Sequence, residues 1–158
     1  MVLEYSLIAL LSPLVGGVIA AFIGKSMGKI FVNASTILGV MISFIFSCML
    51  AMDLYQTSAV FNQNLYTWID IGNFTFHIGL LIDNLTASMM VVVTFVSLMV
   101  HIYTIGYMHD DPGYHRFFAY ISLFTFSMLS LVMSNNFLQL FFGWEAVGVM
   151  SYLLIGFW

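Results

Sequence analysis

The stretch FFAYISLFTFSMLSLVMSNNFLQLFFGWEAVGVMSYLLIGFW, residues 117–158, decides the fold class of this chain. It contains one charged residue, Glu145, and a polar break at Ser134-Asn135-Asn136. An α-helix rises about 1.5 Å per residue, so a single helix crosses ~30 Å of hydrocarbon in about 20 residues. The stretch is too long for one crossing. We therefore predict two membrane-spanning helices, at about 117–133 and 137–158, on either side of the polar break.

The whole chain shares this apolar character. It has 158 residues, of which 62% are hydrophobic and 6% are charged, and its formal net charge is −4. Soluble domains carry about 25% charged residues, so this chain has too little polar surface for a water-soluble globule. Its three basic residues are too few for the positive field that nucleic acid requires. The composition excludes a soluble enzyme, a disordered chain and a nucleic-acid binder, and it predicts a helical integral membrane protein.

Three earlier apolar runs complete the set of predicted spans. They lie at about 7–23, 30–52 and 85–107. Their hydrophobic residues are continuous rather than alternating, which argues against a membrane β-barrel. Because Cys48 is the single cysteine, the chain has neither a disulfide framework nor a cysteine metal site. We expect an all-α integral membrane protein with about five transmembrane helices.

The segment between the second and third spans, residues 53–83, is the one sizeable part predicted outside the membrane. Two runs rich in aromatic and β-branched residues, 66–71 and 74–78, flank the pair Gly72-Asn73. This pattern is typical of a β-hairpin with a two-residue turn. An isolated hairpin is marginally stable in water, so we expect it to pack against something. The sequence leaves open whether that surface is another protein or the ends of the chain's own helices.

The charged residues outside the spans predict the orientation. Basic residues occupy the loops after the first and third spans: Lys25, Lys29 and Arg116. Acidic residues occupy the opposite side: Glu4, Asp53, Asp70 and Asp83. By the positive-inside rule, the basic loops face the cytoplasm or matrix. The N-terminus is therefore expected outside.

Glu145 is the strongest candidate for a functional residue. If the last span begins at Phe137, Glu145 lies about 12 Å along the helix axis, inside the apolar slab. A carboxylate there costs roughly 2.5–3.5 kcal/mol on insertion scales, and such residues usually mark ion or proton paths. Since no Lys or Arg lies within a span, its partner must be a polar side chain, water or another part of the protein. A neutral carboxyl that only packs between helices is the alternative.

Three further residues are candidates for a proton relay. Tyr152 lies two turns beyond Glu145 on the same helix face, although packing is the commoner role of a tyrosine in a span. His101 lies within the third span and titrates near neutral pH when free, which suits a relay. A neutral histidine bonded to a carbonyl or hydroxyl group is an equal alternative. Asp83 precedes the third span, where we expect it to cap the helix, with proton entry as a second role.

The loop 109–116 holds two His and two Asp, which superficially suggests a metal site. Its Asp-Pro-Gly sequence is typical of a turn, and its spacing matches no standard zinc or calcium loop. We therefore interpret this segment as a solvated turn and expect no bound metal.

Three stretches resemble a known family. NFLQLFFGWEAVGVMSYLLIGFW at 136–158 is closely similar to the antiporter-like family of respiratory complex I (NADH:quinone oxidoreductase) called subunit L in bacteria and chain 5 in mitochondria. HIYTIGYM at 101–108 and DPGYHRFFAYISLFTF at 111–126 resemble it as well. The resemblance covers the whole chain and is strongest from Asp83 onward. It implies the N-terminal part of the antiporter-like fold.

The resemblance also implies roles for individual parts. It makes 1–133 an N-terminal region of four transmembrane helices plus the outer hairpin loop, and 134–158 the start of the proton-translocating repeat. Glu145 would be the protonatable residue of the pumping channel, opposite a lysine on a later, broken helix. His101 and Asp83 match family positions with less defined roles.

The implied setting is a multi-subunit assembly. This chain would bind no cofactor, while the assembly uses NADH, FMN, iron–sulfur clusters and a quinone. Its partners would be other membrane subunits of complex I and the lipid bilayer, with no nucleic acid and no small-molecule substrate besides protons. We expect the bacterial inner membrane in preference to the mitochondrial inner membrane.

Length is the main departure from the family, whose members are several times longer. We expect the chain to be an N-terminal fragment, a truncated reading frame or one piece of a split gene, with no catalytic centre and no pumping activity alone. Two other functions stay open. One is the large subunit of a multisubunit cation/proton antiporter, in which the motif usually reads Trp-Glu-Leu-Thr rather than Trp-Glu-Ala-Val-Gly. The other is a non-catalytic membrane scaffold.

Overall fold

The computed structural model describes residues 2–57, 59–72 and 74–158. In chain order, the described elements are α1 (Val2–Phe22), α2 (Gly24–Met27), α3 (Lys29–Thr57), β1 (Phe61–Ile71), β2 (Phe74–Ile82), α4 (Asn84–Tyr107), α5 (Tyr114–Val132) and α6 (Phe137–Ile155). Five of these helices are long and apolar enough to cross a membrane: α1, α3, α4, α5 and α6. The predicted fold class, five transmembrane helices with a hairpin between the second and third, is therefore confirmed.

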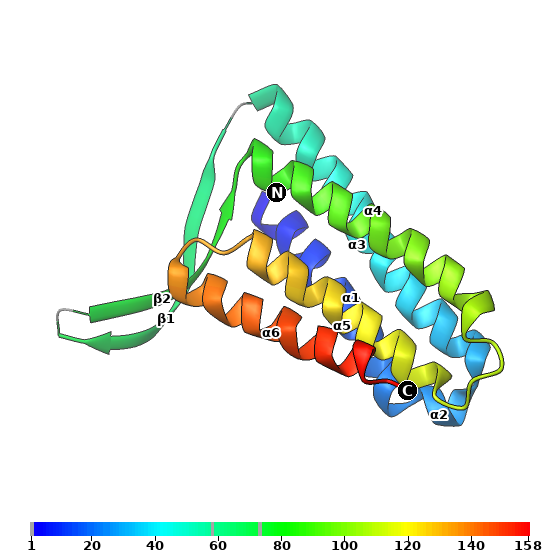
Figure 1. Ribbon diagram of the computed structural model, residues 1–158. Coiled ribbons are helices and arrows are strands. Elements are labelled where there is room, and N and C mark those ends of the chain that lie inside the picture. The colour runs from blue at the N-terminus through cyan, green and yellow to red at the C-terminus, as the bar shows by residue number, and fades with distance from the viewer. Residues whose placement is uncertain (1, 58, 73) are drawn as a thin grey trace.

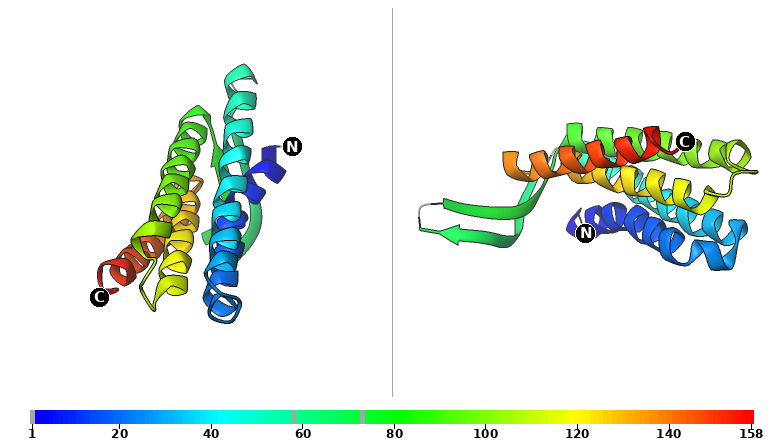
Figure 2. Two further views of the ribbon diagram at one scale, coloured as in Figure 1. Left: turned by 90° about the vertical axis from the view of Figure 1, so that its right-hand side faces the viewer. Right: turned by 60° about the horizontal axis from the view of Figure 1, so that its bottom comes forward.

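The five long helices pack side by side into one bundle, and the hairpin leaves the bundle at one end (Figure 1). Helix α1 packs against α3 and α5, and α4 packs against α3 and α5. Helix α6 lies at the outside of the bundle, with α5 as its helical neighbour (Figure 2). The distal half of the hairpin extends beyond the helix ends (Figures 1 and 2).

The hairpin is longer than the sequence predicted. Its strands pair antiparallel from Phe61 opposite Ile82 to Ile71 opposite Phe74, with irregularities between Asn64 and Tyr66 and further along β1. These irregularities interrupt the alternation of side chains, so the full length of the strands could not be read from the pattern. Gly72 adopts a positive φ of 58°, as a hairpin turn requires. The other predicted turn residue, Asn73, lies outside the described residues.

The basic end of the bundle holds one helix that was not predicted, the single turn α2. It ends because Gly28 has a positive φ of 86°, after which α3 begins at Lys29. The Lys29 ammonium donates a hydrogen bond to the backbone carbonyl of His109 and lies 5.5 Å from the ring centroid of Tyr114. The loops after α1 and after α4 are therefore joined at this end.

Two glycines allow α1 and α3 to approach closely. A Cβ atom at Gly39 would lie 2.6 Å from the backbone oxygen of Ser12, and one at Gly16 would lie 2.7 Å from that of Ser35. Small residues give membrane helices their closest contacts, because lipid chains provide no hydrophobic force between helices. Helices α1 and α3 therefore form a closely packed pair.

Helix α4 begins at a side-chain cap. Asp83 has an extended backbone, and its Oδ1 accepts a hydrogen bond from the Thr86 amide at 2.7 Å. This confirms the predicted cap. The bond from the Thr86 amide also lowers the pKa of the Asp83 carboxyl below its ordinary value.

Replacement of Asp83 by Ala is expected to reduce the free energy of unfolding by about 1 kcal/mol near neutral pH. Since the pKa of Asp83 is lower when folded, the charged carboxyl stabilises the fold above its unfolded pKa. That stability is lost as the pH falls through the folded pKa. Unfolding in detergent, followed by circular dichroism, should show the difference at about pH 7 and a much smaller one at about pH 2. An equal difference at both would contradict the prediction.

Candidate functional site

Glu145 lies midway along α6, and the start of that helix is defined by its cap. The side chain of Asn136 accepts a hydrogen bond from the Gln139 amide at 2.9 Å, and α6 then begins at Phe137 as predicted. Glu145 is therefore about 12 Å from the first residue along the helix axis. The carboxylate stands well within a helix whose length and composition suit a membrane span.

The carboxylate points away from the bundle. Gly143 is the buried residue of α6, and a Cβ atom there would lie 2.9 Å from Cα of Leu131 in α5. Glu145 is two residues further on, about 200° around a helix with 3.6 residues per turn. Its side chain is exposed, and it has no hydrogen bond or ion pair among the described residues. The α5-facing side of α6 is thus opposite Glu145.

The rest of this face also lacks a cover in the described parts of the chain. Tyr152 lies seven residues beyond Glu145 and is 76% exposed, and Trp144 is 66% exposed. Both candidates that the sequence placed on α6 therefore share one uncovered face. An intramembrane carboxylate usually faces a bundle interior or a water-filled cavity, so this face is suited to contact with further polypeptide.

His101 lies elsewhere, fully buried between α4 and α5. Its Nδ1 is 2.8 Å from the backbone oxygen of Ser97, and its Nε2 is 2.9 Å from Oγ of Ser122. A carbonyl oxygen only accepts hydrogen bonds, so a neutral His101 carries its proton on Nδ1. The Ser122 hydroxyl then donates to Nε2. Both ring nitrogens have partners within the bundle.

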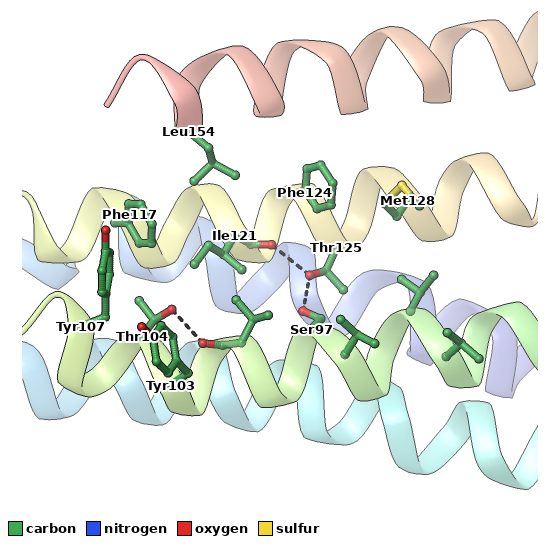
Figure 3. Close-up of a pocket in the computed structure, with 14 residues that line it drawn as sticks. Ser97, Tyr103, Thr104, Tyr107, Phe117, Ile121, Phe124, Thr125, Met128 and Leu154 are labelled. Atoms are coloured by element: carbon green, nitrogen blue, oxygen red, sulfur yellow. Dashed lines mark hydrogen bonds between the residues drawn. The ribbon is translucent and has the colours of Figure 1, made fainter. Parts of the chain in front are cut away.

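A short chain of hydroxyl groups continues from His101, whose Nδ1 lies 3.4 Å from Oγ of Ser97. Oγ of Ser97 is 2.5 Å from Oγ1 of Thr125, which donates to the backbone oxygen of Ile121 at 2.9 Å. The Ser97 hydroxyl therefore donates to Thr125. Both groups line a largely apolar groove of about 540 Å³ between α4 and α5, to which α6 contributes Leu154 (Figure 3).

The four predicted site residues do not form one cluster. Glu145 and Tyr152 share the outer face of α6, His101 lies in the α4–α5 interface, and Asp83 caps α4 at the hairpin end. Sequence reasoning missed Ser97, although its position four residues before His101 was a usable signal. The partners of His101 on α5 come from tertiary packing, which local spacing does not reveal.

The far end of α6 is held by the loop after α4. The Trp158 indole N–H donates to Oδ2 of Asp111 at 2.9 Å, and the Gly113 amide donates to Oδ1 at 2.6 Å. These bonds lower the pKa of the Asp111 carboxyl, with the indole the larger cause. A Cβ at Gly113 would lie 2.5 Å from the ring of Phe157. The loop is therefore a docking point for the residues that follow α6.

A chain of known structure shares the fold of this protein. A chain in the structure of the membrane-bound sulfane sulfur reductase, an archaeal respiratory membrane complex, superposes with a TM-score of 0.72 at 19% identity. The match covers 96% of this chain and 23% of that chain. The protein is thus a multi-pass helical membrane protein whose fold is shared with a component of such a complex.

The sequence comparisons define the family. Residues 68–118 match the family described as NADH-Ubiquinone oxidoreductase (complex I), chain 5 N-terminus. The chain is 58% identical to NADH-quinone oxidoreductase subunit L of Neisseria meningitidis over 98% of its length, and 42% identical to NADH-ubiquinone oxidoreductase chain 5 of Dictyostelium discoideum over 96%. It spans 23% of each relative. The chain belongs to the subunit L and chain 5 family and corresponds to its N-terminal portion.

Proposed function

We propose that this chain is part of a proton-translocating membrane subunit of NADH:quinone oxidoreductase and that Glu145 is its protonatable residue. The observation that carries the proposal is the Glu145 carboxylate, which has no hydrogen-bond or ion-pair partner among the described residues and lies midway along α6 on the face opposite Gly143. A scaffold would have no need of a carboxylate at this depth, where it costs several kcal/mol unless paired. The family relationship supports the same reading.

The proposed chemistry is a change of proton occupancy at the Glu145 carboxylate. A cation that approaches a carboxylate favours its charged form, and withdrawal of the cation favours its protonated form. Because no Lys or Arg lies beside Glu145 in the described chain, we propose that this cation comes from the polypeptide that covers α6. Alternate approach and withdrawal would load and release one proton.

Three residues are proposed as secondary participants. Tyr152 shares the face of Glu145 and could extend its hydrogen-bonded path toward the end of α6. The hydroxyl groups of Ser97 and Thr125 would give His101 a route for a proton toward the groove between α4 and α5. Asp83 would act as a proton-entry carboxylate in addition to its role as a helix cap.

We propose that the electron-transfer chemistry lies in partner subunits. NADH, FMN, iron–sulfur clusters and the quinone would bind there, and this chain would contribute no catalytic centre of its own. Residues 1–133 would form the N-terminal region and 134–158 the start of the proton-translocating repeat. The basic loops would face the cytoplasm of a bacterial inner membrane, with the N-terminus and hairpin outside.

The test is complementation in a bacterium that lacks its own subunit L. A full-length protein that contains this chain should restore NADH-driven proton uptake into inverted membrane vesicles. A matched strain carrying an empty vector sets the background. Restoration of sodium- or potassium-driven proton exchange without NADH-driven uptake would contradict the proposal and favour the cation/proton antiporter.

A further inference from the structure

The side chain of Gln139, in the first turn of α6, is bonded to the hairpin. The backbone amide of Gly79 in β2 donates to Oε1 of Gln139 at 3.0 Å, and Nε2 of Gln139 donates to the backbone oxygen of Gly79 at 2.9 Å. One side-chain amide thus satisfies both backbone groups of one residue, as an adjacent strand would. It occupies part of the exposed edge of the hairpin.

Neighbouring residues reinforce this contact. Nδ2 of Asn136 donates to the backbone oxygen of His77 at 2.9 Å. The Leu81 amide donates to the backbone oxygen of Met133 at 3.0 Å. We call this set of contacts between residues 133–139 and β2 the outer latch. It joins the α5–α6 connection to the hairpin, where Figure 1 shows the two segments crossing.

The outer latch requires glycine at position 79. A Cβ atom at Gly79 would lie 2.8 Å from the backbone oxygen of Gln63 and would overlap the side-chain amide of Asn135. Nδ2 of Asn135 in turn donates to the side-chain oxygens of Asn62 at 3.1 Å and Asn64 at 2.8 Å. The backbone of the hairpin at Gly79 is therefore in direct contact with the side chain of Asn135, just before α6. A side chain at position 79 would not fit between them.

The outer latch and Glu145 lie on different sides of α6, about 120° apart by the shorter way around the axis. Gln139 and Gly143 are four residues apart and share one side of the helix, while Glu145 lies six residues after Gln139, about 240° around the axis. One turn nearer to Glu145, the rings of Phe142 and Trp68 of β1 are 5.8 Å apart. Two supports, the hairpin at Gln139 and α5 at Gly143, thus set the rotation of α6.

We propose that Gln139 is a positioning residue for proton transfer: its bonds to Gly79 fasten α6 to the hairpin and so aim the Glu145 carboxylate at its partner. The inference rests on the proposed function and adds the hairpin to it. Gln139 itself carries no proton. Loosening the outer latch should therefore weaken the coupling of proton transfer to NADH oxidation without removing the protonatable group.

The test uses three variants in the assembled complex. Gln139→Met keeps side-chain length and helix propensity but removes both bonds. Gln139→Glu keeps an acceptor for the Gly79 amide. Gln56→Met is the matched control, because Gln56 is exposed at the end of α3. In Gln139→Met we expect the Gly79 amide to exchange its hydrogen about tenfold faster, equivalent to about 1.4 kcal/mol, as loss of one or two bonds predicts.

The functional readout is protons taken up per NADH oxidised, measured at equal amounts of assembled complex. Gln139→Met should lower this ratio, Gln139→Glu should lower it less, and Gln56→Met should leave it unchanged. A ratio for Gln139→Met equal to that of the control would overturn the inference. Failure of the proposed function is separately visible, because Glu145→Gln would then pump normally. If Glu145→Gln is defective and Gln139→Met is not, only the positioning role is wrong.

Discussion

Replacement of Glu145 by Gln in the assembled complex is expected to stop proton transfer through this subunit. Glutamine has the shape of glutamate but carries no exchangeable acid proton, so the occupancy change at this position is lost. Removal of a positioned proton-transfer group typically costs about 10²–10⁴-fold in rate. Proton uptake by proteoliposomes, divided by the NADH oxidised, should fall by the share of protons that passes through this subunit.

Two variants make this result specific. Glu145→Asp retains the acid and should retain part of the activity, since its carboxyl is one methylene shorter. Asp53→Asn removes a different carboxylate, near the hairpin end of α3, and should leave the ratio unchanged. Normal proton uptake by Glu145→Gln at normal assembly would favour the scaffold interpretation, in which Glu145 only packs.

Replacement of Gly39 by Leu is expected to have the largest effect on stability. A Cβ at this position meets the Ser12 backbone oxygen at 2.6 Å, so α1 and α3 must move apart. Their separation also strains the hydrogen bond from Ser43 Oγ to the Ala9 backbone oxygen, now 2.6 Å long. Overpacking of this kind typically costs about 1–3 kcal/mol, and backbone contact places this site at the upper end.

The matched control for Gly39 is Gly106→Leu in the last turn of α4, where no described atom beyond the adjacent residues and the helix's own nearby backbone lies within 4 Å of the added Cβ. Unfolding of the full-length protein in mixed micelles, followed by circular dichroism, should show destabilisation in Gly39→Leu only. Equal stabilities of the two variants would contradict the close α1–α3 packing.

The helices were predictable because each depends on local composition. Continuous uncharged runs of membrane-spanning length leave few alternatives, and the polar break at Ser134-Asn135-Asn136 correctly predicted that α6 begins at about Phe137. The turn α2 was not predictable in the same way. It depends on the backbone conformation of Gly28 and on its closing bond to Gly24, neither of which has a periodic signal.

The candidate site was predictable in part. The cost of an intramembrane carboxylate was enough to single out Glu145, but not the direction in which it points. That direction depends on Gly143 meeting Leu131 of α5, a contact between different helices. The bonds of Gln139 to Gly79 and of His101 to Ser122 are equally long-range in sequence. Spacing along one helix contains no information about them.

The central claim is that the Glu145 carboxyl changes its protonation state while the complex oxidises NADH. The most direct measurement is an infrared difference spectrum between the resting and NADH-driven states of the assembled complex. We predict a change in a carboxylic-acid C=O band that is present in the unmodified complex and in Asp53→Asn but missing in Glu145→Gln. A difference spectrum that is the same in Glu145→Gln as in the unmodified complex would contradict the claim.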